Sequence, residues 1–190
     1  MTAVNNSAGA AMKSIYLILT RSTSAASRLI GHFTDEPYTH VSIAFEPKTH
    51  IMYSFARKYA RLPLPAGLVE ENMDGGFYRN QGNIPCAVLR LDVDEKTYYR
   101  AKNRICDMLV RREEFRYSVL GLLACKMGIP AEIPGHYFCS QFVAEILADT
   151  CRVKLPCPPS LMHPADYLDM DCFRCEFCGG LTEFLAASAA

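Results

Sequence analysis

The chain has 190 residues, a formal net charge of zero, 50% hydrophobic and 21% charged residues, 11 glycines and 11 prolines. These values are typical of a folded protein and exclude a disordered chain, a collagen and a coiled coil. The balanced charge also argues against a nucleic-acid partner, because binding to a phosphate backbone normally shows as a basic surplus.

The chain length favours one domain, which we place at residues 13–186, after a disordered tail at residues 1–12. The longest apolar run near the start, Ile15–Leu19, is too short for a transmembrane segment or for the apolar core of a signal peptide. The sequence therefore predicts a cytoplasmic protein.

Nine cysteines are present, an odd number that does not suggest a disulfide framework. Cys86, Cys106 and Cys125 lie in apolar stretches, so we expect them to be buried as small hydrophobic residues. A reducing compartment fits this interpretation.

The first half of the chain reads mainly as strands. Ser14–Thr20 is apolar and β-branched, and Ser24–His32 is predicted as a short helix. Strand His40–Phe45 alternates, and a turn at residues 46–49 leads to its hairpin partner His50–Ala56. We expect the face of this strand that carries His40, Ser42 and Ala44 to pack against a helix, because its side chains are small.

Prolines and glycines punctuate Leu62–Asn83, which is therefore predicted as a long loop. This loop is either a specificity wall over the active-site cleft or an ordinary surface loop. Cys86–Val93 follows as a strand, and a helix capped by Asp94 is expected to run to Arg111. Later elements are a helix at Val119–Met127, a helix from Cys139 to Thr150 and a last strand at Cys172–Phe177. This order of elements predicts an α+β domain with a mostly antiparallel sheet packed against helices.

Cys139 stands apart from the other cysteines. Pro134 and Gly135 interrupt the chain just before it, and a helical apolar stripe begins just after it. The thiol therefore lies in the first turn of a helix, where unpaired N–H groups and the positive end of the helix dipole stabilise a thiolate. The alternative is that Cys139 is an ordinary small core residue.

The histidine best placed to act as its base is His40, at the start of a strand. An imidazole within hydrogen-bond reach of a thiol is the minimum equipment for acyl transfer. A single histidine near a strand end is more often a solvated or core residue, so the pair carries more weight than either member.

A resemblance supports the pair. The segments Tyr38–Ile43, Met52–Phe55 and Phe138–Val143 resemble the permuted branch of the papain-like NlpC/P60 superfamily, similar to its YiiX-like and lecithin:retinol acyltransferase-like members. The resemblance covers about residues 13–184 and includes Pro164-Ala165-Asp166. The histidine precedes the cysteine here, which is the order of the circularly permuted group.

The resemblance implies a permuted papain-like fold and a cysteine peptidase or amidase, with Cys139 as nucleophile and His40 as general base. The backbone N–H of Cys139 would help to hold the oxyanion. The family usually has a polar residue on the next strand that orients the imidazole, and this position falls on Ser54. A serine departs from that pattern, because it offers no negative charge to an imidazolium.

We therefore expect a thiol-dependent hydrolase of an amide bond in a small peptide or a peptidoglycan-type fragment, with no cofactor. Tyr38, Tyr117 and Ser140 are the expected substrate-binding residues, because they lie next to the histidine strand or the cysteine helix. Acyl transfer or ester hydrolysis on a lipid is an alternative. A weakly catalytic binding module of the same fold is another, and Ser54 is its best support.

A zinc site is the remaining alternative. Cys172, Cys175 and Cys178 are spaced by two residues, as thiolate ligands often are, with Cys151 and Cys157 upstream. If this segment is a strand, however, Cys175 points away from the other two thiols. We therefore expect no metal at this position.

Overall fold

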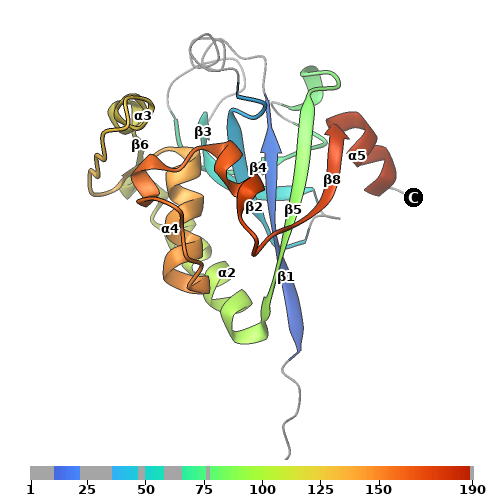
Figure 1. Cartoon of the computed structure of the whole chain (residues 1–190), viewed down its shortest axis with the longest axis horizontal. Helices are drawn as coiled ribbons and strands as arrows, with labels where there is room; N and C mark the ends of the chain where they lie inside the picture. Colours follow the sequence, from blue (N-terminus) through green and yellow to red (C-terminus); the bar gives the residue numbers. More distant parts are fainter. Residues whose placement is uncertain (1–10, 22–35, 47–49, 58–65, 76–77, 189–190) are drawn as a thin grey trace, which may run out of the picture.

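The structure, a computed structural model, describes residues 11–21, 36–46, 50–57, 66–75 and 78–188 (Figure 1). Most of the predicted tail at residues 1–12 and the predicted helix at residues 24–32 lie outside these ranges. Met12 is the first residue of the first strand, so this strand begins one residue before the predicted domain boundary.

The described residues contain a six-stranded sheet in the order β4-β3-β2-β1-β5-β8, and every neighbouring pair is antiparallel. Its strands are β1 (Met12–Thr20), β2 (His40–Ala44), β3 (Ile51–Arg57), β4 (Ala66–Asn72), β5 (Pro85–Asp94) and β8 (Arg174–Gly180). Strands β6 (Arg116–Tyr117) and β7 (His136–Tyr137) form a separate short parallel pair. The α+β class and the antiparallel sheet are thus as predicted.

Strand β4 corrects the prediction of a loop over Leu62–Asn83. It pairs with β3 along its whole length at the edge of the sheet, and Met52 lies opposite Glu71. The sequence AGLVEEN hides the strand because Gly67, Glu70 and Glu71 weaken the alternation of apolar and polar residues. Pairing with β3 supplies the stabilisation that local propensity lacks.

The three helices predicted after residue 94 agree closely with the structure, and a last helix at Leu181–Ser188 was not predicted. The helices are α2 (Glu95–Val110), α3 (Val119–Lys126), α4 (Cys139–Cys151) and α5 (Leu181–Ser188), with short 3-10 turns η2 (Tyr78–Asn80), η3 (Arg112–Glu114), η4 (Pro159–Leu161) and η5 (Pro164–Asp169). The Asp94 carboxylate accepts a 2.9 Å hydrogen bond from the Thr97 backbone N–H and so caps α2, as expected. None of the helices within the described ranges is long and apolar enough to cross a membrane.

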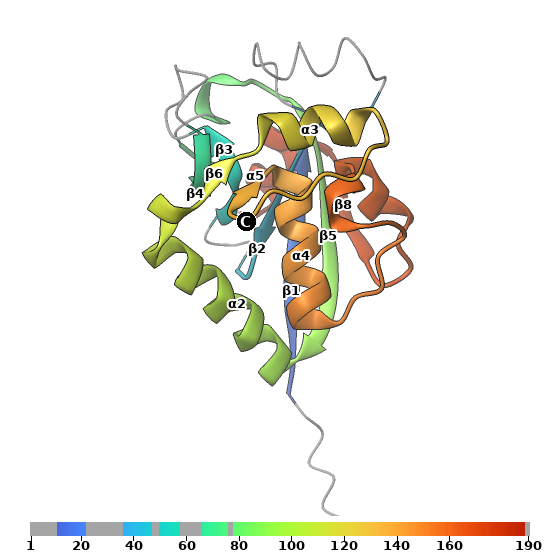
Figure 2. The same ribbon diagram turned by 90° about the vertical axis from the view of Figure 1, so that its left-hand side faces the viewer.

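The sheet separates two apolar cores. Helices α2 and α4 cover one face, and α5 lies against the other (Figures 1 and 2). Val41 and Ile43 of β2 and Phe45 just after it pack on the α4 side, whereas Ala44 belongs to the α5 side. The expectation that the Ala44 face meets the cysteine helix was therefore wrong, because α4 packs its own large apolar side chains against the bulkier face of β2.

The cysteines are distributed less uniformly than predicted. Cys86 and Cys125 are buried, as expected, but Cys106 is exposed on the outer side of α2. The apolar residues around Cys106 belong to the opposite, buried stripe of the amphipathic helix, so a locally apolar sequence misplaced it.

Candidate functional site

Cys139 is the first residue of α4, as the sequence predicted. Phe138 before it is extended and offers no side-chain cap to the helix, so the first-turn N–H groups remain free of a capping side chain. Cys139 is 5% exposed and belongs to the apolar core on the face of the sheet that α2 and α4 cover. The backbone N–H of Ser140, in the first turn of α4, donates a hydrogen bond to the sulfur.

The surroundings of Cys139 favour its thiolate. Burial raises the pKa of the thiol, but a hydrogen bond from His40, the charge of that imidazole and backbone hydrogen bonds from Val41 and Ser140 outweigh burial and lower the pKa below its usual value. A lowered thiol pKa means that a larger fraction of the cysteine is nucleophilic at neutral pH.

His40, the first residue of β2, contacts a carboxylate that the sequence interpretation did not identify. Its Nε2 lies 3.0 Å from Oε1 of Glu71, and the two side chains are 16% and 11% exposed. Burial lowers the pKa of His40, but the charge of Glu71 and the hydrogen bonds to Cys139 and Glu71 together raise the pKa to about 10. The imidazole is therefore held as an imidazolium between a thiolate and a carboxylate.

The two ring nitrogens of His40 contact different partners. Nε2 is engaged by Glu71 and lies 3.2 Å from the Ser42 hydroxyl oxygen. We therefore assign the contact with Cys139 to Nδ1, the remaining ring nitrogen. Each ring N–H of the imidazolium then has one anionic partner.

Hydroxyl groups of three buried residues, Ser42, Ser54 and Tyr78, hydrogen-bond Glu71. Ser42 donates to Glu71 Oε1 at 3.0 Å, and Ser54 donates to the same oxygen. Burial raises the pKa of Glu71, but the charge of His40 and the hydrogen bonds from His40, Ser54 and Ser42 lower it. The carboxylate therefore stays ionised although it is largely buried.

Ser54 thus does not contact His40 in the way the sequence suggested. It reaches the imidazole only through Glu71, which supplies the negative charge that a serine lacks. The available signal for Glu71 was its position in an acidic pair just after the apolar Leu68-Val69, inside a segment interpreted as a loop. Only the pairing of β4 with β3 places it beside Ser54.

A small pocket, with a volume of about 30 Å³, opens at Cys139. It is lined by Glu36, Thr39, Tyr117, Leu122, Cys125, Lys126, Phe138, Cys139, Ser140, Met162, His163 and Pro164. Tyr117 and Ser140, both expected to bind substrate, therefore lie beside the thiol. Among the described residues, the buried Thr39 hydroxyl oxygen has no hydrogen-bond partner, so it is available to a bound molecule.

Tyr38, the third expected substrate-binding residue, is not brought to this pocket. Its side chain is 6% exposed, and its hydroxyl lies 3.6 Å from the Cys178 sulfur on β8. Another tyrosine contacts the residue that follows Cys139. Tyr167 is fully buried, and its hydroxyl donates to the Ser140 carbonyl oxygen at 2.8 Å. That contact anchors the first turn of α4.

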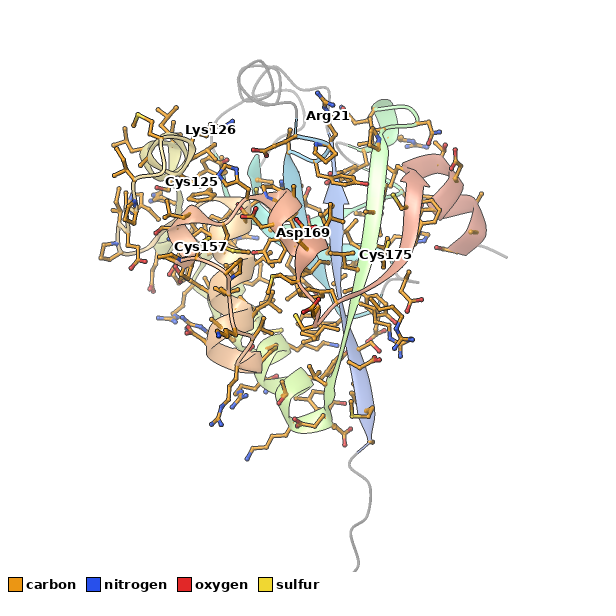
Figure 3. All side chains as sticks on the ribbon, viewed as in Figure 1. Arg21, Cys125, Lys126, Cys157, Asp169 and Cys175 are labelled. Atoms are coloured by element: carbon orange, nitrogen blue, oxygen red, sulfur yellow. The ribbon has the colours of Figure 1, made fainter. Side chains whose placement is uncertain are left out.

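The C-terminal cysteines do not converge. A register shift in the pairing of β5 with β8 places Cys175 opposite Leu89 and Cys178 opposite Ala87, so the expected alternation of these two thiols is interrupted. Both are exposed, and Cys172 precedes the strand. Figure 3 places Cys175 across the molecule from Cys125 and Cys157. Within the residues that the structure describes, no group of three or more histidine, cysteine or acidic side chains is arranged to hold a metal ion.

Comparisons of the chain with protein-family models, with curated proteins and with solved structures found no match. The resemblance to the permuted papain-like superfamily therefore remains an expectation from the sequence. The function has to be inferred from the geometry of Cys139, His40 and Glu71 and from the pocket beside them.

Proposed function

We propose that the protein is a thiol-dependent hydrolase that cleaves an amide bond in a small peptide or peptidoglycan-type fragment through an acyl-enzyme on Cys139. The observation that carries this proposal is the chain of contacts from Cys139 through His40 to Glu71. A thiol, an imidazole and an orienting carboxylate are the groups that nucleophilic acyl transfer requires.

In the first step the Cys139 thiolate attacks the carbonyl carbon of the substrate. The C–S bond forms, and negative charge develops on the carbonyl oxygen. Backbone N–H groups at the start of α4 are the donors expected to stabilise it, and the unpaired Thr39 hydroxyl in the same pocket is a second donor.

Collapse of this intermediate expels the amine, and the His40 imidazolium donates the proton that the leaving nitrogen needs. Neutral His40 then removes a proton from water, which attacks the thioester and releases the acid and the Cys139 thiolate. Glu71 acts as a positioning residue: it keeps Nε2 occupied and stabilises the positive imidazolium.

The contact with Glu71 weakens the alternative of a non-catalytic binding module. That alternative depended on Ser54 being the imidazole-orienting residue, without a charge. A carboxylate 3.0 Å from the imidazole removes this objection. The order of a histidine strand before a cysteine helix, on an antiparallel sheet, supports our proposal of a permuted papain-like fold.

The test is a panel of chromogenic amides and esters, including short peptide anilides and peptidoglycan-type peptides, with adducts read by mass spectrometry after acid quench. We expect an acyl adduct on the Cys139 peptide and loss of turnover in Cys139→Ala. The matched control is Cys106→Ala, which removes an exposed thiol outside the pocket. Equal turnover by the wild-type protein and Cys139→Ala, or no adduct on Cys139 with any donor, would overturn the proposal.

A second candidate is acyl transfer or ester hydrolysis on a lipid. The favouring observation is a set of exposed apolar side chains on and just after α3: Val119, Leu120, Leu123 and Met127. Leu122 and Cys125 of the same helix line the pocket, so this apolar surface adjoins the reactive thiol. A lipid acyl chain would find an apolar surface there.

An assay with lipid vesicles distinguishes the lipid reaction from the peptide reaction. A lipid reaction predicts that turnover of a phospholipid ester rises when the protein is given vesicles and falls in Leu120→Ser/Leu123→Ser. The peptide reaction predicts no dependence on vesicles and full activity of that variant. Both outcomes require Cys139, so Cys139→Ala serves as the blank in each assay.

A further inference from the structure

The pocket holds a second thiol beside a second histidine. Cys125, near the end of α3, has its sulfur 3.6 Å from Nε2 of His163. Nδ1 of His163 lies 2.9 Å from Oε1 of Glu36. All three side chains line the same pocket as Cys139. The connectivity, thiol to imidazole to carboxylate, repeats that of Cys139, His40 and Glu71.

The pKa shifts of His163 and Glu36 are those expected of an imidazole that contacts both a thiol and a carboxylate. The hydrogen bonds to Cys125 and Glu36 raise the pKa of His163 to about 10, although burial opposes them. The hydrogen bond with His163 lowers the pKa of Glu36. The N–H on Nδ1 donates to the carboxylate, and the N–H on Nε2 faces the Cys125 sulfur.

An ordinary structural role explains only part of this arrangement. His163 precedes η5, and its backbone N–H donates to Asp166 at 2.7 Å, as expected of a capping residue. Capping does not require the imidazole to join a buried thiol to a carboxylate from a distant segment. Cys125 is 3% exposed and meets the pocket, not bulk solvent.

We propose that Cys125, with His163 and Glu36, is a second nucleophilic thiol of the pocket that accepts a small acyl group. The Cys125 sulfur attacks the carbonyl carbon as a thiolate, with the proton held on Nε2 of His163. The C–S bond forms, the bond to the leaving group breaks, and His163 returns the proton to that group. The product is a thioester on Cys125, and no oxidant, reductant or metal takes part.

The acyl group has two possible sources. An ester in the pocket can react with Cys125 directly, with an alcohol as leaving group. A thioester on Cys139 can instead exchange with Cys125, with the Cys139 thiolate as leaving group; this route alone rests on the proposed function. Thioester exchange replaces one C–S bond by another, so it needs no further co-reactant.

The experiment uses the full chain and p-nitrophenyl acetate as the acyl donor, with acetyl groups assigned to each cysteine by peptide mass spectrometry. We expect Cys125 to be acetylated at least about tenfold faster than exposed Cys106. In Cys139→Ser, retained acetylation of Cys125 identifies the direct source. Its loss in that variant identifies exchange from Cys139.

Two variants isolate the second group. His163→Asn keeps a residue that caps well before η5, and Glu36→Gln keeps the size of the side chain. Both are expected to reduce acetylation of Cys125 by about tenfold while acetylation of Cys139 persists. Acetylation of Cys125 at the rate of Cys106, or unchanged in both variants, would overturn the inference. Failure of the proposed function would instead appear at the Cys139 peptide.

Discussion

Glu71 and His40 lie on strands that are not neighbours, yet Glu71 Oε1 is 3.0 Å from His40 Nε2. Strand β3 separates their strands, and its Ser54 donates to the same carboxylate oxygen. The carboxylate therefore reaches the imidazole across one strand of the sheet. This relationship makes the thiol and imidazole a charged pair oriented by an anion.

Glu71→Gln tests the contribution of that charge. The amide retains the size and acceptor oxygen of Glu71 but loses its negative charge, so the imidazolium is less stable and the Cys139 pKa rises. We expect alkylation of Cys139 at about pH 6 to slow by about tenfold. Glu70→Gln, on the exposed side of the same strand, is the matched control and should react like the wild-type protein.

Ser54→Ala tests whether the serine acts through the carboxylate. Loss of the hydroxyl removes one buried hydrogen bond to Glu71, so stability should fall by about 1 kcal/mol in urea unfolding. Alkylation of Cys139 should slow less than in Glu71→Gln. In the Glu71→Gln background the effect of Ser54→Ala on alkylation should shrink; an undiminished effect would show that Ser54 acts independently.

The pH dependence of the free energy of unfolding distinguishes the contribution of His40 from that of Cys139. Folding raises the pKa of His40 to about 10, so its contribution is complete below about pH 6.5 and is lost as pH rises through about 10. Folding lowers the pKa of Cys139, so its contribution is present above about pH 9 and is lost as pH falls through the folded value.

Between about pH 6.5 and about pH 9 the two effects oppose each other, because the proton that Cys139 loses is the one that His40 gains. The wild-type free energy of unfolding should then depend little on this site. In Cys139→Ser only the His40 shift remains, so stability relative to wild type should decline as pH rises. Parallel profiles in urea unfolding would contradict the assignment of an ion pair.

The packing of α4 on the sheet can be tested separately from the chemistry. Phe142 is 1% exposed, and its ring lies 5.2 Å from that of Phe55 on β3. Phe142→Ala should lower the free energy of unfolding by about 3–5 kcal/mol, because it leaves a cavity at the centre of this core. Leu123→Ala, at an exposed position of α3, should change it by less than about 0.5 kcal/mol.

Strong local patterns made much of the fold predictable. The alternation in β2 and the stripe and Asp94 cap of α2 are signals carried by neighbouring residues. The start of α4 at Cys139 was also predictable, because Gly135 and the following apolar stripe bound it locally. These signals placed the thiol and the imidazole on the correct elements.

Contacts between distant segments were not predictable in this way. β4 is an edge strand whose pairing with β3 outweighs a weak local pattern, so Glu71 was hidden in an expected loop. His163 and Glu36 are separated by 127 positions, and nothing in their local sequences indicates that they meet at Cys125. The orientation of β2 was missed because alternation identifies two faces without saying which one a helix covers.

The most direct test of the central claim is the pH dependence of iodoacetamide labelling at each cysteine, read by peptide mass spectrometry on the native protein and on His40→Ala. Normalising each cysteine to its own rate at high pH removes the effect of burial on access of the reagent. We predict that the labelling rate of Cys139 falls at a lower pH in the native protein than in His40→Ala, because the imidazolium lowers the pKa of the thiol. The His40→Ala substitution should move the Cys139 profile to higher pH, because burial then raises the thiol pKa without the opposing imidazolium; the same Cys139 profile in the native protein and in His40→Ala would contradict the thiolate–imidazolium pair.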